Sequence, residues 1–230
     1  MWPAALGGRA PRGYHHSSMT ASPIIVHGTP LSGHTHRVVS FLAILGLPHQ
    51  LVDTPAALRG TPEFRALNPL GQVPVIQDGE LVIADSNAIL VYLARRYAAG
   101  SRWLPDEPVA AAAVQRWLSI AAGELKYGPA AARVVTVWRG PGSLADAHAI
   151  AARVLRFMDD QLASRAFLAG DHATIADLAC YAYVAHAPEG RISLADYPHL
   201  RGWLARVEAV PGFQPMQRTV IAEPEPAIEA

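Results

Sequence analysis

Apolar and polar positions are patterned most clearly between residues 72 and 97. Residues 72–77 (QVPVIQ) and 81–83 (LVI) are short runs rich in β-branched and apolar residues, which is typical of strands. Asp78-Gly79 at the end of the first run predicts a tight hairpin with a type I′ turn, which needs positive φ at both central positions. Acceptor side chains then precede apolar residues at helical spacing, and two arginines follow them. The pattern predicts a strand, a hairpin, a second strand and a helix.

The stretch before this unit has the same character. Residues 24–27 (IIVH) form a short apolar run that indicates a first strand. A loop over residues 29–36 leads into a helix that stops at Gly46 and has an apolar stripe at Val38, Val39, Phe41, Leu42 and Leu45. A second strand is expected around residues 49–52, followed by a short irregular helix. Alternating strands and helices are typical of an α/β domain.

The pattern changes after residues 100–108 (GSRWLPDEP), which read as a linker with Gly, Pro and acidic residues. The first helix beyond it has an apolar stripe at Val114, Leu118, Ala121 and Leu125. Gly128-Pro129 should kink or break that helix. Thr174 and Asp177 have the spacing of a capping box, which indicates a structural role. Further helices are expected at residues 144–163, 178–187 and 197–210.

These changes divide the chain into a leader, two domains with a linker between them, and a tail. The boundaries are placed at residues 1–22, 23–99, 100–108, 109–215 and 216–230. The leader has no acidic residue and no periodicity, and its apolar part is too short and broken for a secretory signal. We interpret it as a disordered segment upstream of a natural start near Met19, with a targeting peptide as the alternative. The tail is expected to fray from Glu223.

Composition narrows the possible partners. The chain of 230 residues has 19 basic and 19 acidic side chains, which argues against nucleic acid or an anionic membrane as the main partner. No apolar run reaches the roughly 18–20 residues that a membrane-spanning helix needs. Cys180 is the only cysteine, so an internal disulfide, a CxxC redox pair and a cysteine metal cluster are all excluded. These features fit a cytoplasmic protein best.

Two pairs of residues in the first domain suggest a receptor for a small peptide. Pro74 begins a strand, and a cis Val73–Pro74 bond would turn the backbone N–H and C=O of Val73 outward, where an extended peptide could pair with them. Ser86 offers a hydroxyl and free N–H groups at a helix start, which suit a carboxylate. Asp85 beside it offers a negative charge that suits an ammonium group. Together they match an amino-acid zwitterion.

The run Asn68-Pro-Leu-Gly-Gln-Val-Pro74, followed by a hairpin and by Asp85-Ser86 before a helix, resembles the glutathione-binding half of cytosolic glutathione S-transferases. The resemblance covers nearly the whole chain, from about residue 23 to about residue 215, and is to bacterial, serine-type members of theta- or phi-like character. The family usually has Glu where Asp85 stands. The resemblance implies a thioredoxin-like N-terminal domain with a mixed four-stranded sheet and an all-α C-terminal domain. It also implies a homodimer without a cofactor, with glutathione as co-substrate.

The resemblance implies that Ser32 stabilises the glutathione thiolate, because Gly28-Thr-Pro-Leu-Ser32 is similar to the catalytic segment of the serine-dependent classes. A plain N-cap serine is the alternative interpretation. Lowering a thiol pKa of about 8.5 to neutrality requires roughly 2–3 kcal/mol. A hydroxyl hydrogen bond to a charged acceptor supplies about 1.5–3 kcal/mol, and a helix N-terminus adds about 0.3–1 kcal/mol. The segment contains no Tyr and no Cys, and Thr29 and His34 are further candidates for the thiol contact.

Other site residues follow from the same resemblance. Gln72, Val73, Pro74, Asp85, Ser86 and His34 are expected to bind glutathione. Arg59 is a candidate for its glycyl carboxylate, with an ordinary solvated arginine as the alternative. Leu31 and Tyr127 are candidates for the second-substrate pocket, although an aromatic residue on that helix is more often part of the core. No metal site is predicted, since residues two apart on a helix, such as His34 and His36, point to different faces.

These residues favour a transferase that directs a glutathione thiolate at a small hydrophobic electrophile. A second enzymatic interpretation has the same thiolate attack a disulfide or a peroxide, as a glutathione-dependent reductase or peroxidase. A third is a non-catalytic, transferase-like ligand-binding module, because a fold does not fix a function. The identity of the electrophile is not encoded in any motif of the chain.

Overall fold

The computed structural model describes residues 22–219 and residue 221. The predicted leader therefore lies outside the described residues except for Ser22, and so does the end of the tail that was expected to fray. No helix in the described part of the chain is long and apolar enough to cross a membrane.

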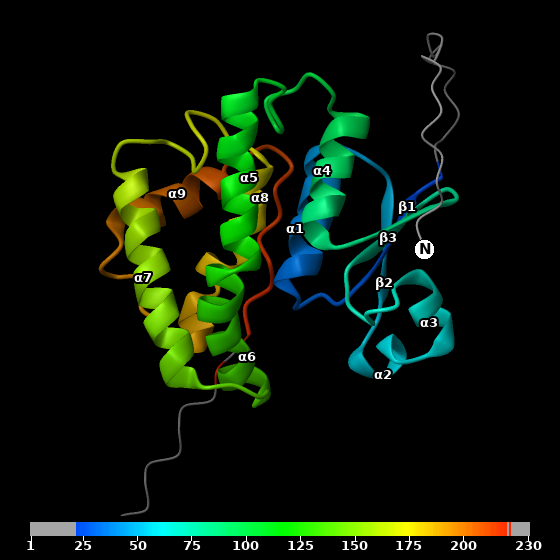
Figure 1. Ribbon diagram of the computed structural model, residues 1–230, viewed down its shortest axis with the longest axis horizontal. Helices are drawn as coiled ribbons and strands as arrows, with labels where there is room; N and C mark the ends of the chain where they lie inside the picture. The colour runs from blue at the N-terminus through cyan, green and yellow to red at the C-terminus, as the bar shows by residue number, and fades with distance from the viewer. Residues whose placement is uncertain (1–21, 220, 222–230) are drawn as a thin grey trace, which may run out of the picture.

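The first half of the chain forms a four-stranded mixed sheet with the order β2-β1-β3-β4. Its strands are β1 (Ile24–Gly28), β2 (His49–Asp53), β3 (Val75–Asp78) and β4 (Leu81–Ala84). β1 is parallel to β2 and antiparallel to β3, and β3 is antiparallel to β4. The helices are α1 (Gly33–Ile44), α2 (Ala56–Arg59), α3 (Pro62–Leu67) and α4 (Ser86–Tyr97). Figure 1 shows α1 and α4 between the sheet and the helices of the second half.

The β3–β4 hairpin is confirmed, but the predicted type of its turn is wrong. Asp78 pairs with Leu81, so the two central residues are Gly79 and Glu80 rather than Asp78 and Gly79. Only Gly79 has positive φ, at 58°. A type I′ turn needs positive φ at both central residues, whereas a type II′ turn needs it at the first one only. Asp78 instead belongs to the strand, where its carboxylate accepts a hydrogen bond from the Tyr92 hydroxyl.

The second half is helical. Its elements are α5 (Pro108–Ala122), a π-helical turn η1 (Lys126–Ala130), α6 (Ala131–Trp138), α7 (Leu144–Leu162), α8 (Ile175–Ala185), a 3₁₀ turn η2 (Ala187–Gly190) and α9 (Pro198–Glu208). The predicted break at Gly128-Pro129 is confirmed, because Pro129 lies inside η1. The chain then resumes as α6, a separate helix that the sequence pattern did not predict.

α8 lies at the centre of the molecule, and the predicted capping box begins it. The Thr174 side chain accepts from the backbone of the first turn, and the Asp177 carboxylate accepts from the Thr174 N–H. Every residue from Ile175 to Val184 is buried. One hydrophobic cluster includes α8 together with Ile76 of the sheet and Trp117 of α5. The two halves of the chain therefore share a core.

Candidate active site

The register of the sheet brings three predicted site segments to one edge. His27 is opposite Val75, so Gly28 and the loop that follows lie beside Pro74. Val75 is also opposite Ala84, which places Pro74 beside Asp85 on the other side. Thr54, which follows β2, donates its N–H to the Gly28 carbonyl at 2.8 Å. Three segments are thus neighbours in space: the loop after β1 that contains the candidates for the thiol contact, the Val73–Pro74 segment and the start of α4.

Ser32 is the N-cap of α1, and its Oγ accepts a hydrogen bond from the Thr35 N–H at 3.3 Å. The capping alternative is therefore correct as a description of the fold. It does not exclude the catalytic one, because a serine hydroxyl has one hydrogen to donate besides its acceptor lone pairs. Among the described residues, the Ser32 hydroxyl accepts the cap bond and donates to no partner. Ser32 is half-buried at the positive end of a helix dipole, where a thiolate would be stabilised.

Ser86 is buried at the first turn of α4 and is held by two residues of α1. His34 Nδ1 lies 2.9 Å from the Ser86 Oγ, and Arg37 Nη1 donates to the same oxygen at 3.3 Å and to Asn87 Oδ1 at 2.7 Å. Burial, with the nearby charges of Arg37 and Lys126, lowers the pKa of His34 to about 3. Its imidazole is therefore neutral near pH 7. His34, which was one candidate for the thiol contact, therefore contacts Ser86 at the start of α4 in the structure.

Asp85 has a positive φ, which is uncommon for a residue other than glycine, with φ 74° and ψ 120°. One carboxylate oxygen accepts from the Asn87 and Ala88 N–H groups at 2.9 and 3.0 Å, which caps α4. The side chain is exposed and keeps its second oxygen for another partner. A non-glycine residue in such a conformation costs about 1–3 kcal/mol, and residues of this kind gather at ligand sites.

The Val73–Pro74 peptide bond is cis. Among the described residues, neither backbone group of Val73 takes part in a hydrogen bond. The loop before it is tied down by buried Asn68, whose Nδ2 donates to the Gln72 carbonyl at 2.8 Å. The Gln72 side chain is exposed. An extended ligand could therefore pair with Val73 without displacing a bond of the protein.

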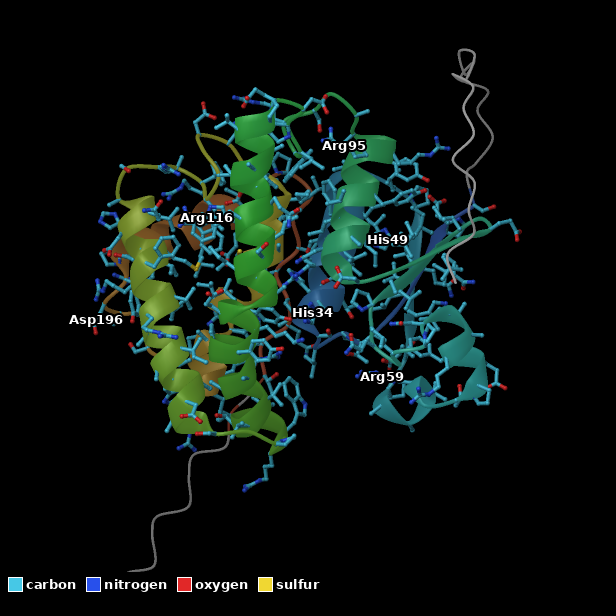
Figure 2. All side chains as sticks on the ribbon, in the orientation of Figure 1. His34, His49, Arg59, Arg95, Arg116 and Asp196 are labelled. Atoms are coloured by element: carbon cyan, nitrogen blue, oxygen red, sulfur yellow. The ribbon has the colours of Figure 1, made fainter. Side chains whose placement is uncertain are left out.

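Arg59 lies at the end of α2, next to this loop. Its Nε donates to the Thr54 carbonyl at 3.0 Å, and no bond among the described residues uses its Nη atoms. Gly71 has φ 63°, and a Cβ there would lie only 2.9 Å from the Arg59 carbonyl oxygen, so the two segments touch. Figure 2 shows Arg59 on α2 and His34 at the start of α1.

The second half of the chain adds residues that sequence reasoning missed. Buried Arg133 of α6 donates through Nη1 to the Leu31 carbonyl at 2.8 Å, one residue before Ser32. Trp138, at the end of the same helix, is 46% exposed and lies under the Arg133 guanidinium at 4.6 Å. Tyr127 is 58% exposed in η1, whereas Trp117 is core, as expected for an aromatic residue of that helix. No local pattern marks Arg133, because its partners are distant in the sequence.

The three histidines near the first strand have different partners. His27 contacts the Gln77 side chain, and His36 contacts the Gln214 carbonyl at 2.7 Å. His34 is bound to Ser86, as described above. Among the described residues, no group of three His, Cys, Asp or Glu side chains could hold a metal ion.

Comparison with known proteins identifies the family to which this chain is similar. Residues 31–96 match the model for the N-terminal domain of glutathione S-transferases, and residues 143–211 match the model for their C-terminal domain. Glutathione S-transferase 3 of Zea mays is 32% identical over 218 residues, which cover 89% of this chain and 96% of that protein. The chain belongs to the glutathione S-transferase family.

Other glutathione S-transferases support the same assignment. Glutathione S-transferase theta-3 of Mus musculus is 33% identical over 192 residues, covering 76% of this chain and 79% of that protein. The crystal structure of a glutathione S-transferase from Pseudomonas fluorescens superposes with a TM-score of 0.80 at 32% identity, covering 85% of this chain and 99% of that one. The predicted fold class is confirmed: a thioredoxin-like domain with a mixed four-stranded sheet precedes a helical glutathione S-transferase domain.

Proposed function

We propose that this glutathione S-transferase binds glutathione at the carboxyl edge of β1, ionises its thiol with the hydroxyl of Ser32, and directs the thiolate at a small hydrophobic electrophile. The backbone of Val73 would pair with the cysteinyl residue of glutathione. The first turn of α4 at Ser86 would take the γ-glutamyl carboxylate, and Asp85 the ammonium group. Arg59 would approach the glycyl carboxylate from α2, with Gln72 beside it.

The chemistry is nucleophilic substitution or addition by sulfur. The thiol proton leaves to water, and the thiolate remains hydrogen-bonded to the Ser32 O–H. The sulfur then forms a bond to the electrophilic carbon. In a substitution the leaving group departs with its electron pair, and in an addition the neighbouring atom gains the pair and is protonated by water. Leu31, Tyr127 and Trp138 lie on the side of the second domain, where we place the electrophile.

The observation that carries the proposal is that, among the described residues, the Ser32 hydroxyl accepts one hydrogen bond, from the Thr35 N–H, and donates none. Its hydrogen is therefore available to an acceptor placed at the sheet edge. A hydroxyl and a helix N-terminus together match the roughly 2–3 kcal/mol that thiol ionisation at neutral pH requires.

The test is a titration of glutathione into the protein, followed by thiolate absorbance near 240 nm. We expect a thiolate signal at neutral pH that Ser32→Ala abolishes. Ser143→Ala is the matched control, because Ser143 also caps a helix with its hydroxyl, accepting from the Asp146 N–H at 3.2 Å at the start of α7. A signal that is unchanged in Ser32→Ala would refute the mechanism. Binding without any thiolate signal would instead indicate a non-catalytic module.

The electrophile is best found by activity profiling against halogenated aromatics, epoxides, isothiocyanates, peroxides and mixed disulfides. Turnover of the first three classes supports transfer to a carbon electrophile, and turnover of the last two alone would favour the reductase or peroxidase function. We further propose that the protein is a cytoplasmic homodimer, on the basis of its family. Light scattering should then give twice the mass of the chain.

A further inference from the structure

Arg133 is a buried cation at the junction of four segments. It is 5% exposed, and each of its three nitrogens has a partner. Nε contacts Glu189 Oε2 at 2.6 Å, Nη1 contacts the Leu31 carbonyl at 2.8 Å, and Nη2 contacts the Thr219 hydroxyl at 3.3 Å. The planar guanidinium thereby joins α6, η2, the loop before α1 and the C-terminal segment. A fixed fork of donors is the property that distinguishes arginine from lysine.

Glu189 fixes the orientation of this fork. It is 6% exposed, and its second oxygen contacts His186 Nδ1 at 2.6 Å and the Thr219 N–H at 2.9 Å. These donors hold the pKa of Glu189 below its ordinary value, despite the burial that acts in the opposite direction. Arg133 therefore faces a carboxylate that is itself held in place, and cannot swing away from Leu31 without breaking a buried ion pair.

The Leu31 carbonyl belongs to the peptide that precedes Ser32. On the other side of this short loop, the Thr29 N–H donates to the buried Thr35 hydroxyl at 3.2 Å, and the Ser32 N–H donates to the Thr29 carbonyl at 3.1 Å. Ser32 is also tied to α1, because its Oγ accepts from the Thr35 N–H and its carbonyl accepts from the His36 N–H at 2.8 Å. Arg133 holds the neighbouring Leu31 carbonyl from outside α1. The direction of the Ser32 hydroxyl therefore depends on both α1 and Arg133.

We infer that Arg133 is a positioning residue that sets the acidity of the bound thiol by holding the Leu31–Ser32 peptide in place. The inference rests on the proposed role of Ser32. The second domain then contributes to thiol activation through the first domain's loop, without a contact to sulfur. Small errors in placement cost much activity when a hydrogen bond must meet a developing charge.

The test compares Arg133→Met, Arg133→Lys and wild type by the pH dependence of the 240 nm thiolate signal with saturating glutathione. We expect Arg133→Met to raise the pKa of the bound thiol by about one unit, which means about tenfold less thiolate below the pKa and a similar fall in kcat. The KM for glutathione should change by less than about threefold, because Val73, Asp85 and Ser86 do not contact Arg133. Arg133→Lys, with one ammonium for three partners, should give an upward shift of about half a unit.

Arg206→Met is the matched control. Arg206 also donates to a loop carbonyl, that of Ala166 at 2.7 Å, on α9. The Arg206→Met variant should have a lower melting temperature than wild type and an unchanged pKa of the bound thiol. A folded Arg133→Met protein with the wild-type thiol pKa would overturn the inference, and so would Arg133→Lys with that pKa if the methionine variant does not fold. Failure of the proposed role of Ser32 would give a different result from failure of the Arg133 inference. In that case the thiolate signal of the wild-type protein would be absent, or Ser32→Ala would not change it.

Discussion

At the scale of single residues, two polar side chains of the site combine a structural bond with a free hydrogen-bonding group. Among the described residues, the Ser32 hydroxyl accepts the bond that caps α1 and donates none, and only one oxygen of Asp85 is used to cap α4. Because cap and ligand group share a side chain, a substitution to alanine changes folding and binding together. An isosteric change separates the two effects.

Asp85→Asn keeps an oxygen that can accept from the Asn87 and Ala88 N–H groups but removes the charge. We expect the dissociation constant for glutathione to rise about fivefold, the size of an exposed ion pair, with an unchanged melting temperature. Calorimetric titration and thermal unfolding measure the two quantities. Asp85→Ala is the comparison, and should lower both affinity and stability because it also removes the cap. Unaltered affinity in Asp85→Asn would contradict a role in ammonium binding.

Two histidines of α1 make the stability depend on pH. Burial lowers the pKa of His34 to about 3 and that of His36 to about 4, from an ordinary 6.5. As the pH falls below about 6.5 the unfolded chain takes up protons that the native state does not, so the free energy of unfolding falls. Each histidine contributes up to about 1.4 kcal/mol per pH unit between its two pKa values. The contribution is fully present above pH 6.5.

Urea unfolding at pH 7, 6 and 5 tests this expectation. His36→Gln is the informative variant, because its amide can still donate to the Gln214 carbonyl but cannot titrate. We expect a shallower decline of stability with falling pH in this variant than in wild type. Identical slopes in the two proteins would show that His36 does not remain neutral in the folded state.

At the scale of elements, the start of α8 depends on one carboxylate. Asp177 is fully buried and accepts from the Leu168 N–H, the Trp203 indole N–H and the Thr174 N–H, at 3.0, 2.8 and 2.8 Å. Burial outweighs these bonds and raises the pKa of Asp177 above its ordinary value. Asp177 therefore joins α8 to α9 through Trp203, and to the loop that precedes α8 through Leu168.

Asp177→Ala would leave these three donors buried without an acceptor. We expect a loss of about 3–5 kcal/mol in the free energy of unfolding, measured by urea denaturation. Thr61→Ala, which removes an ordinary cap at the start of α3, should cost about 1 kcal/mol. If the two losses were equal, the carboxylate would be no more than a helix cap.

At the scale of the whole molecule, the shared core predicts a single unfolding transition. Four of the five tryptophans, Trp103, Trp117, Trp138 and Trp203, follow the first domain, whereas the proposed glutathione-binding groups belong to it. Binding at one half should therefore stabilise the other.

Glutathione at about 100 times its dissociation constant should add about 2.7 kcal/mol to the free energy of unfolding. We expect tryptophan fluorescence and far-UV circular dichroism to report the same increase. Ser86→Ala, which weakens the carboxylate site, should reduce the increase in both signals by the same amount. A fluorescence transition that does not respond to glutathione while the dichroism does would mean that the halves unfold independently.

The sequence predicted those features that depend on neighbouring residues. The Asp85 cap, the Thr174–Asp177 box and the break at Pro129 each involve residues a few positions apart, so their signals are local. The turn type was wrong because strand pairing, rather than the Asp-Gly pair, sets the register.

Arg133 and Arg37 could not be found by such reasoning. Arg133 meets Leu31 across 102 residues and Glu189 across 56, and Arg37 meets Ser86 across 49. Both are buried charges, whereas periodicity marks a charged position as solvent-exposed. Hydrogen bonds and ion pairs between polar residues that are distant in the sequence therefore could not be predicted and were found only in the structure.

Helix α1 begins after its N-cap Ser32 and, through His34 and Arg37, also holds Ser86. Under the proposed function, this one helix would fix the distance between the sulfur of bound glutathione, at Ser32, and its γ-glutamyl carboxylate, at Ser86. A ligand with a β-aspartyl group in place of the γ-glutamyl group is shorter by one methylene. It could satisfy either end of that span but not both, so the protein should discriminate against it by length alone.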